Sequence, residues 1–199
     1  MAIQKLDIIN TALRMVGSYH LDRLDDGSST YEIADGAYTA AFQEIFGENI
    51  FTFNRKRVTL TGTESADEQY SHSYTLPNDL NIFIKAENSD RFVISDYYTE
   101  GSTMLANYST LTLYYSYIPS DEDITSLPAY LHRLLSLHMA ANMAIELSGS
   151  ENRVIQLSQQ YVAARSRARV MSARQGPAQE YIDASTSRFL RAHNQYGKV

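Results

Sequence analysis

Histidines and acidic pairs are the residues of this sequence that could bind a metal ion or hydrolyse a sugar polymer. No two histidines have the i, i+4 spacing of a helical zinc site, and no nearby carboxylate completes a ligand set. Asp25 with Asp26, and the acidic run 121–123, could support glycoside hydrolysis only if two carboxyl groups faced each other across a cleft. Both groups lie in loop sequences, which favours solvated turns. The histidines, which we interpret as structural, are His20, His72, His132, His138 and His193.

Motifs that mark the common enzyme classes are missing from the sequence. It contains no G-x-S-x-G, P-loop or G-x-G-x-x-G pattern, so no characteristic motif supports an α/β-hydrolase, a nucleoside triphosphatase or a dinucleotide-binding enzyme. The absence of cysteine excludes disulfides and thiolate metal sites. No apolar run approaches the roughly 20 residues that span a bilayer, and the first ten residues lack the features of a signal peptide. We therefore expect no catalytic, metal-binding or cofactor-binding residues and no membrane partner.

One stretch, FTFNRKRVTL, combines aromatic and basic residues in the manner of a nucleic-acid contact. In a strand, however, Phe51 and Phe53 point to one side, whereas Val58 and Leu60 point to the other. The apolar face therefore switches at the basic residues that end with Arg57, as expected where a chain passes from one layer to another through a bulge or crossover. We interpret the stretch as a structural seam. Its phenylalanines pack on helices, its aliphatic pair enters a sheet, and its basic side chains cover the join.

Hydrophobic periodicity divides the chain into helical and β-rich segments. Apolar residues recur at helical spacing at both ends, whereas β-branched residues, tyrosines and turn sequences such as LPND and ENSD fill the middle. We predict an α+β fold, in which a four-helix unit carries an inserted antiparallel β-rich subdomain and an extended C-terminal tail. The expected helices cover residues 3–16, 29–46, 127–147 and 151–174. The expected domains are 1–49 and 126–175 for the helical unit, 50–125 for the β-rich insertion and 176–199 for the tail.

Particular residues set the expected ends and faces of these elements. Ser29 and Glu32 have the spacing of a capping box at the start of the second helix, and Gly47 is expected to end it. The sequence TLTLYYSYI, residues 110–118, is the clearest strand. The side chains expected to share one face of that strand are Leu111, Leu113 and Tyr115.

Charge is distributed unevenly along the chain, whose net charge is −6. Residues 151–199 carry eight basic and three acidic groups, a net charge of +5, whereas residues 1–150 carry nine basic and twenty acidic groups, a net charge of −11. A basic segment on an acidic body indicates a negative partner for that segment. The helix 151–174 places a row of arginines beside its apolar stripe, which suits acidic neighbours across a subunit boundary. We expect inter-subunit contacts at Arg165, Arg167, Arg169 and Arg174.

The segment after Gly176 and Pro177 has too little apolar content to form a core of its own. It does carry aromatic, aliphatic and basic anchors, and segments of this kind commonly become ordered on binding a partner. We interpret it as a docking tail for a partner protein, with simple disorder as the alternative. The anchors are Tyr181, Ile182, Arg188, Phe189, Leu190, Arg191 and Tyr196.

Several stretches, taken in order and spacing, resemble the tail tubular protein A family: NTALRMVG, FTFNRKRVTL, YTLPNDL, LTLYYSYI and LPAYLHRLLSLHMAANMAIELSGS, the last followed by LSQQYVAARSRA. The resemblance covers about residues 10–175. Family members often carry a tryptophan-x-phenylalanine at the seam, where this chain has Phe51 and Phe53. These proteins are head-to-tail adaptors, or gatekeepers, of short-tailed phages. They are defined by packing and assembly, so the resemblance carries over no active site.

The resemblance implies a structural virion protein of the tail connector region, assembled in the host cytoplasm. It implies self-association into a dodecameric ring beneath the portal protein and above the tail nozzle, which is built of tail tubular protein B. Genomic DNA would pass through the channel without specific binding. An acidic body suits this role, because like charge keeps DNA from adhering to the wall.

Two alternatives from other functional classes stay open on the sequence. A virion-associated cell-wall or polysaccharide hydrolase would need a cleft that holds paired carboxylates with perturbed pKa values. A nucleic-acid-binding module would use the arginine row of residues 165–174 and would bind DNA in a salt-dependent manner.

Overall fold

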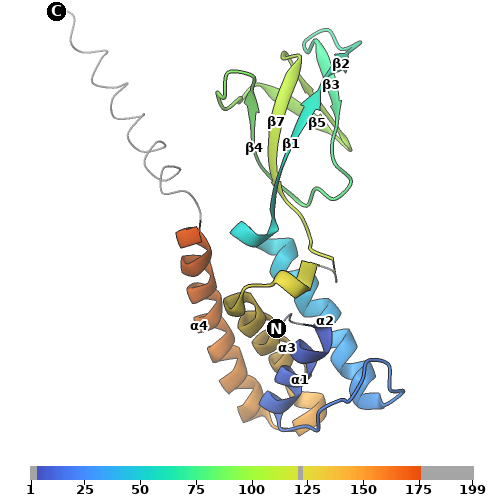
Figure 1. The fold of residues 1–199 in the computed structure, drawn as a ribbon, viewed down its shortest axis with the longest axis vertical. Coiled ribbons are helices and arrows are strands. Elements are labelled where there is room, and N and C mark those ends of the chain that lie inside the picture. Colours follow the sequence, from blue (N-terminus) through green and yellow to red (C-terminus); the bar gives the residue numbers. More distant parts are fainter. Residues whose placement is uncertain (1–3, 121–122, 176–199) are drawn as a thin grey trace, which may run out of the picture.

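The molecule consists of a helical lobe and a β-rich lobe, joined by two short connecting segments (Figure 1). The computed structural model describes residues 4–120 and 123–175. Helices precede and follow a run of antiparallel strands, so the predicted α+β class is confirmed. The helices are α1 (Lys5–Val16), α2 (Ser29–Glu48), α3 (Ala129–Ser148) and α4 (Glu151–Gln175), and two 3₁₀ turns, η1 (Thr52–Asn54) and η2 (Asp123–Ser126), lie near the connections.

α3 is the central helix of the helical lobe, as its apolar composition predicts. α1, α2 and α4 all pack against it, because side chains around most of its circumference are apolar and buried. Gly17 and Gly149 end α1 and α3 with left-handed φ values of 82° and 62°. No helix within residues 4–120 and 123–175 is long and apolar enough to cross a membrane. The buried core of this lobe includes Ile9, Leu13, Phe42, Phe46, Leu131, Leu134 and Met143.

The start of α2 is capped by Ser28, so the predicted capping box of Ser29 and Glu32 is wrong. The Ser28 Oγ accepts a hydrogen bond from the Tyr31 N–H at 3.1 Å. Asp26 Oδ1 accepts from both the backbone N–H and the hydroxyl of Ser28, at 2.9 and 2.6 Å. Asp26 therefore orients Ser28, and not Ser29, as the cap. The helix begins at Ser29, one residue earlier than a cap at Ser29 would allow.

The end of α2 lies beyond Gly47, where the sequence predicts a stop. The helix continues to Glu48 because a side-chain amide from the β-rich lobe binds its last carbonyl groups. Asn81 Nδ2 donates to the carbonyl oxygens of Phe46 and Gly47, at 3.2 and 3.0 Å. A tertiary contact thus overrides the local helix-ending preference of glycine.

The β-rich lobe contains two antiparallel sheets, with strand orders β1-β7-β4 and β2-β3-β6-β5. Val58 pairs with Leu113 and Leu60 pairs with Leu111 across β1 and β7. The shared face predicted for Leu111, Leu113 and Tyr115 is confirmed, because all three side chains are buried in the core of this lobe. The strands are β1 (Arg55–Thr61), β2 (Thr63–Glu64), β3 (His72–Thr75), β4 (Ile82–Asn88), β5 (Tyr97–Glu100), β6 (Thr103–Ala106) and β7 (Thr110–Ser116).

Candidate assembly surfaces and the lobe junction

The seam between the lobes begins with a 3₁₀ turn and not with a regular strand. Phe51 is fully buried and packs edge-on against Phe46, with 6.2 Å between ring centroids, and Phe53 packs against the same helical core. The strand begins only at Arg55, so the predicted switch of the apolar face is produced by η1 and not by a bulge. The aliphatic pair that follows in β1 packs against the core of the β-rich lobe, as predicted.

The basic residues of the seam lie at the surface. Arg57 is exposed, while Lys56 Nζ lies 3.8 Å from the centre of the Tyr117 ring and donates to Asp79 Oδ2 at 2.7 Å. The Tyr115 hydroxyl donates to the other oxygen of Asp79 at 2.9 Å. The hydrogen bond from Lys56 lowers the pKa of Asp79, and burial followed by the contact with that carboxylate raises the pKa of Tyr115 to about 12. Lys56 therefore stabilises the chain's own fold.

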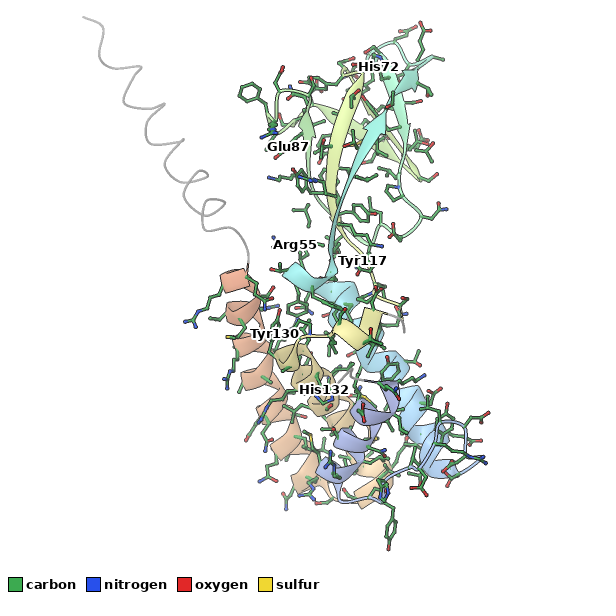
Figure 2. All side chains as sticks on the ribbon, in the orientation of Figure 1. Arg55, His72, Glu87, Tyr117, Tyr130 and His132 are labelled. Carbon is green, nitrogen blue, oxygen red and sulfur yellow. The ribbon has the colours of Figure 1, made fainter. Side chains whose placement is uncertain are left out.

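Asn54 ties the two connecting segments to the end of α2. Its buried amide donates to the carbonyl oxygens of Asn49 and Tyr117 at 3.2 and 3.1 Å, and its side-chain oxygen accepts from the Phe51 N–H at 2.7 Å. The Tyr117 N–H donates back to the Asn54 carbonyl at 3.0 Å. Figure 2 shows Arg55 and Tyr117 where the chain crosses between the lobes. Because these bonds satisfy a buried amide in one orientation, Asn54 fixes how the lobes meet.

The predicted arginine row divides into two pairs. Arg165 and Arg169 donate to Asn49 Oδ1 at 3.3 and 3.0 Å, and Arg165 also lies 3.6 Å from a carboxylate oxygen of α2. They place positive charge at the C-terminal end of α2, where the helix dipole is negative. Arg167 and Arg174 are exposed. Two of the four arginines therefore contact their own chain, and the other two stay candidates for contacts with another copy.

Thr52 and Ser172 attach the end of α4 to the seam. The Thr52 N–H donates to Ser172 Oγ at 2.7 Å, and the Thr52 hydroxyl donates to the Ser172 carbonyl at 2.8 Å. The ends of α2 and α4 and both connecting segments thus meet in one hydrogen-bonded junction. The predicted anchors of the docking tail lie outside the described residues; they are Tyr181, Ile182, Arg188, Phe189, Leu190, Arg191 and Tyr196.

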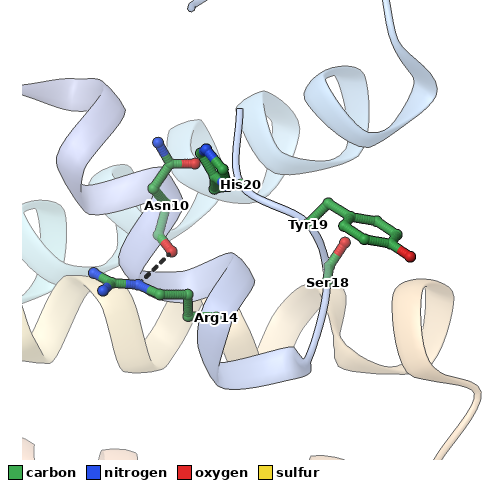
Figure 3. A pocket seen from close by; sticks show the side chains of 5 residues that line it. All are labelled: Asn10, Arg14, Ser18, Tyr19 and His20. Carbon is green, nitrogen blue, oxygen red and sulfur yellow. Dashed lines mark hydrogen bonds between the residues drawn. The ribbon is translucent and has the colours of Figure 1, made fainter. Parts of the chain in front are cut away.

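An open pocket of about 440 Å³ lies at the C-terminal end of α1 (Figure 3). The polar groups of the Asn10 side chain, which lines the pocket, already have partners within the chain. Its amide donates to the Leu21 carbonyl at 2.9 Å, and its oxygen accepts from the Leu21 N–H at 2.7 Å. Arg14 Nε donates to the Asn10 carbonyl at 3.4 Å. The side chains that line the pocket in the described structure contain no carboxylate pair, and they are Asn10, Arg14, Ser18, Tyr19 and His20.

The acids considered for hydrolysis hold turns together. Asp26 accepts two hydrogen bonds from Ser28, and these lower the pKa of Asp26, which is opposite to the direction that a general acid needs. Asp123 Oδ2 accepts from the N–H and the hydroxyl of Ser120 at 2.8 and 3.1 Å. Asp25 takes a left-handed φ of 56° in the loop before α2. The other two members of the acidic run lie outside the described residues.

Two histidines of α3 occupy structural environments. His138 pairs with Glu44 and stacks on Tyr161, with 4.3 Å between ring centroids. His132, labelled in Figure 2, is half-buried, and burial lowers its pKa although Asp7 acts in the opposite direction. Within the described parts of the chain, no group of three histidine or acidic side chains could hold a metal ion.

Most of the exposed apolar side chains lie at three places on the described surface, and Ile50 and Ile145 lie elsewhere. The first place is the turn after β4, where the Asn88 side-chain oxygen accepts from the N–H groups of Asp90 and Phe92 at 3.0 and 2.9 Å. Surface patches of this kind are typical of contacts with other proteins. The exposed side chains are Phe92, Val93 and Tyr98 in the β-rich lobe, Tyr19 and Leu24 in the loop after α1, and Ile155, Val162 and Val170 on α4.

Comparison with known proteins gives no assignment: no family model matches the chain, and no curated protein matches it. Evidence on function therefore comes from the chain itself. It consists of the exposed surfaces and the lobe junction.

Proposed function

We propose that this protein is a ring-forming head-to-tail adaptor of a short-tailed phage, of the tail tubular protein A type. In this proposal the four-helix unit closes a dodecameric ring with neighbouring copies. The β-rich insertion meets the tail nozzle, and the C-terminal tail reaches the portal protein. Genomic DNA passes through the channel without specific binding, because the chain outside residues 151–199 is strongly acidic.

The observation that carries the proposal is the position of the exposed apolar residues relative to the lobe junction. Phe92 and Val93 follow Asn88, which pairs with Leu111 at the end of β7 farthest from the junction. Apolar side chains of α4 lie along the helical lobe on the other side of the junction. An adaptor that closes a ring through one lobe and meets the tail nozzle through the other requires contact surfaces in both lobes and a fixed connection between them. The hydrogen bonds of Asn54 supply that connection.

Removal of residues 177–199 tests the portal contact. The shortened protein is expected to keep its fold, because it retains all of α4 (Glu151–Gln175), which is attached to the seam through Ser172. It is expected to lose binding to portal rings, measured by co-sedimentation and by electron microscopy of the mixture. Phe92→Ser is the matched control, which should bind portal rings normally and lose affinity for the nozzle. A shortened protein that still assembles on portal rings would refute the proposed role of the tail.

A DNA titration separates the adaptor from a nucleic-acid-binding module. The adaptor is expected to show little affinity for duplex DNA even at low salt. Salt-dependent binding that disappears in the double variant Arg167→Ala and Arg174→Ala would favour the module instead. Turnover of a bacterial polysaccharide that is lost on changing Asp25 and Asp26 to asparagine would favour the hydrolase.

A further inference from the structure

α4 has two apolar faces, and the described structure uses only one of them. Leu157 and Ala168 are buried where α4 packs on α3. Ile155, Val162 and Val170 lie on the other side of the helix and are 56%, 62% and 53% exposed. At about 100° per residue, spacings of seven and eight residues bring these three side chains within roughly 80° of one another. An apolar stripe on the outer side of a helix indicates contact with a second surface.

The surroundings of this stripe have the character of an interface. Ala163 and Ser166 are small and exposed, and the Ser166 hydroxyl donates back to the Val162 carbonyl at 3.2 Å, so it needs no external partner. Arg167 and Arg174 border the stripe. This outer face of α4 is therefore apolar at its centre and basic at its edge. It consists of Ile155, Val162, Ala163, Ser166, Arg167, Val170 and Arg174.

α2 presents an outer face that is mostly uncharged and carries one acidic residue. A Cβ atom placed on Gly36 would meet no atom within 4 Å, so nothing in the described chain requires glycine there. Glycine in the middle of a helix weakens the helix, and close approach of another backbone is a use that accounts for it. The outer face of α2 consists of the exposed residues Glu32, Gly36, Thr39, Ala40 and Gln43.

The two helices are complementary in charge and separated in space. On the two outer faces, α2 carries Glu32 and no basic residue, whereas α4 carries Arg167 and Arg174 and no acidic residue. The other acids of α2, which are Asp35, Glu44 and Glu48, pair with Lys5, His138 and Arg165 of the same chain. Figure 1 shows α2 and α4 on opposite sides of α3, against which both pack. One copy therefore cannot bring its own two outer faces together, but a second copy can.

We propose that the outer face of α4 in one copy docks on the outer face of α2 in the next copy. The proposal rests on the ring-forming function proposed above and names the surfaces that close the ring. Because the two faces differ, the contact is heterologous and repeats head to tail, which generates a closed ring when the rotation per copy divides a full turn. Segment 176–199 is a poorer occupant of α4, because its three basic and two acidic residues add positive charge beside the arginines.

Two single variants and their mixture test this contact. Val162→Asp disrupts the outer face of α4, and Gly36→Leu fills the outer face of α2. Each variant is expected to be monomeric by size-exclusion chromatography with light scattering at concentrations where the wild type forms rings. Neither should melt earlier than the wild type, because both positions are exposed and leucine favours a helix more than glycine does.

The mixture distinguishes a heterologous contact from a symmetric one. An equimolar mixture retains one intact α4 face and one intact α2 face, so it is expected to give a heterodimer and nothing larger. Val93→Asp is the matched control, because Val93 in the β-rich lobe is 62% exposed, as Val162 is. Its rings should be unaffected.

Wild-type protein that stays monomeric, Gly36→Leu protein that still forms rings, or a mixture that stays monomeric would overturn the proposed contact. Rings that form through these faces but do not bind portal rings would overturn the adaptor function and leave the contact intact. Equal occupancy of portal rings by wild-type and Val162→Asp copies would overturn the contact and leave the adaptor function intact.

Discussion

The two lobes are stabilised by different kinds of interaction. The core of the helical lobe is formed almost entirely by aliphatic side chains and phenylalanine rings, which need no specific partner. The smaller core of the β-rich lobe contains Tyr74 and Tyr115, whose rings are buried. Their hydroxyl groups donate to the Tyr108 carbonyl and to Asp79, respectively. The core of the β-rich lobe therefore depends on directional hydrogen bonds from its buried tyrosines, whereas the core of the helical lobe is stabilised mainly by apolar contacts.

This difference predicts that the stability of the helical lobe depends less on pH than the stability of the β-rich lobe. Burial of aliphatic groups does not respond to pH, whereas the hydrogen bonds of the Tyr115–Asp79–Lys56 cluster weaken when any member changes its charge. Substitutions at the junction, in each lobe and at titrating groups test whether the two lobes are stabilised in these different ways.

The largest effect is expected for Asn54→Ala, which breaks the link between the lobes. Two carbonyl groups and one N–H group lose their buried partner, so the free energy of unfolding should fall by about 3 kcal/mol. Hydrogen exchange of β7 and α3 amides should then show two transitions in urea where the wild type shows one. Asn81→Ala, which removes two half-buried contacts, is the milder control. A single transition in Asn54→Ala with wild-type stability would contradict the role of this residue.

Glycine-to-alanine substitutions should have opposite signs in the two lobes. At Gly62 an added Cβ would lie 2.8 Å from the His72 Cβ and 3.0 Å from the Tyr74 ring, so Gly62→Ala should lose about 1–3 kcal/mol. At Gly36 the space is open, so Gly36→Ala should gain about 0.5–1 kcal/mol in the monomer. Urea denaturation of both variants measures the pair. Equal effects at the two positions would show that the groups around Gly62 shift to accommodate the added Cβ without a loss in the free energy of unfolding.

Alkaline pH should act on the β-rich lobe through Tyr115. Burial raises the pKa of Tyr115 to about 12, so the unfolded chain releases this proton first, and stability falls as the pH rises from about 10 to 12. Tyr115→Phe should remove this contribution and should also cost about 1.5 kcal/mol at neutral pH, because the hydrogen bond to Asp79 is lost. Denaturation at pH 7, 10 and 11 tests both statements. An unchanged alkaline slope in the variant would exclude Tyr115 as its source.

Acidic pH should act weakly on the helical lobe through His132. Burial lowers the pKa of this imidazole, so the unfolded chain takes up the proton first. The contribution of the neutral His132 imidazole to the free energy of unfolding is fully present above a pH of about 6.5 and is lost as the pH falls below it. His132→Gln should flatten the dependence of unfolding on pH between 7.5 and 5. Parallel curves for the variant and the wild type would assign that slope to other groups.

Sequence periodicity was sufficient to predict the elements whose burial follows local spacing. The face of β7 that carries Leu111 and Leu113, and the apolar circumference of α3, are examples. The same reasoning failed at the ends of α2, where Ser28 and Asp26 share the capping and where Asn81 extends the helix past Gly47. The start of the helix depends on which of several adjacent polar residues caps it, and its end depends on a partner 34 residues away. Hydrophobic spacing carries information on neither.

The lobe junction could not be predicted from the sequence, because its members are polar residues far apart in the chain. Thr52 and Ser172 are separated by 120 residues, and so are Asn49 and Arg169. An amphipathic pattern places Arg169 beside the apolar stripe of α4, but it cannot show which surface the guanidinium meets. Burial of Asn54 gives no periodic signal, since a single asparagine in a basic stretch is normally exposed.

The pairing of Asn54 with Tyr117 has a further consequence for how such a molecule can change over time. The chain leaves the helical lobe and returns to it at two backbone groups that share one hydrogen bond. A module attached in this way can be exchanged for another of different size, since a replacement needs only to begin and finish at neighbouring points. Grafting a foreign β-rich cassette between these two residues would therefore leave the helical lobe unchanged apart from the Asn81 contacts at the end of α2, while the far tip varied freely.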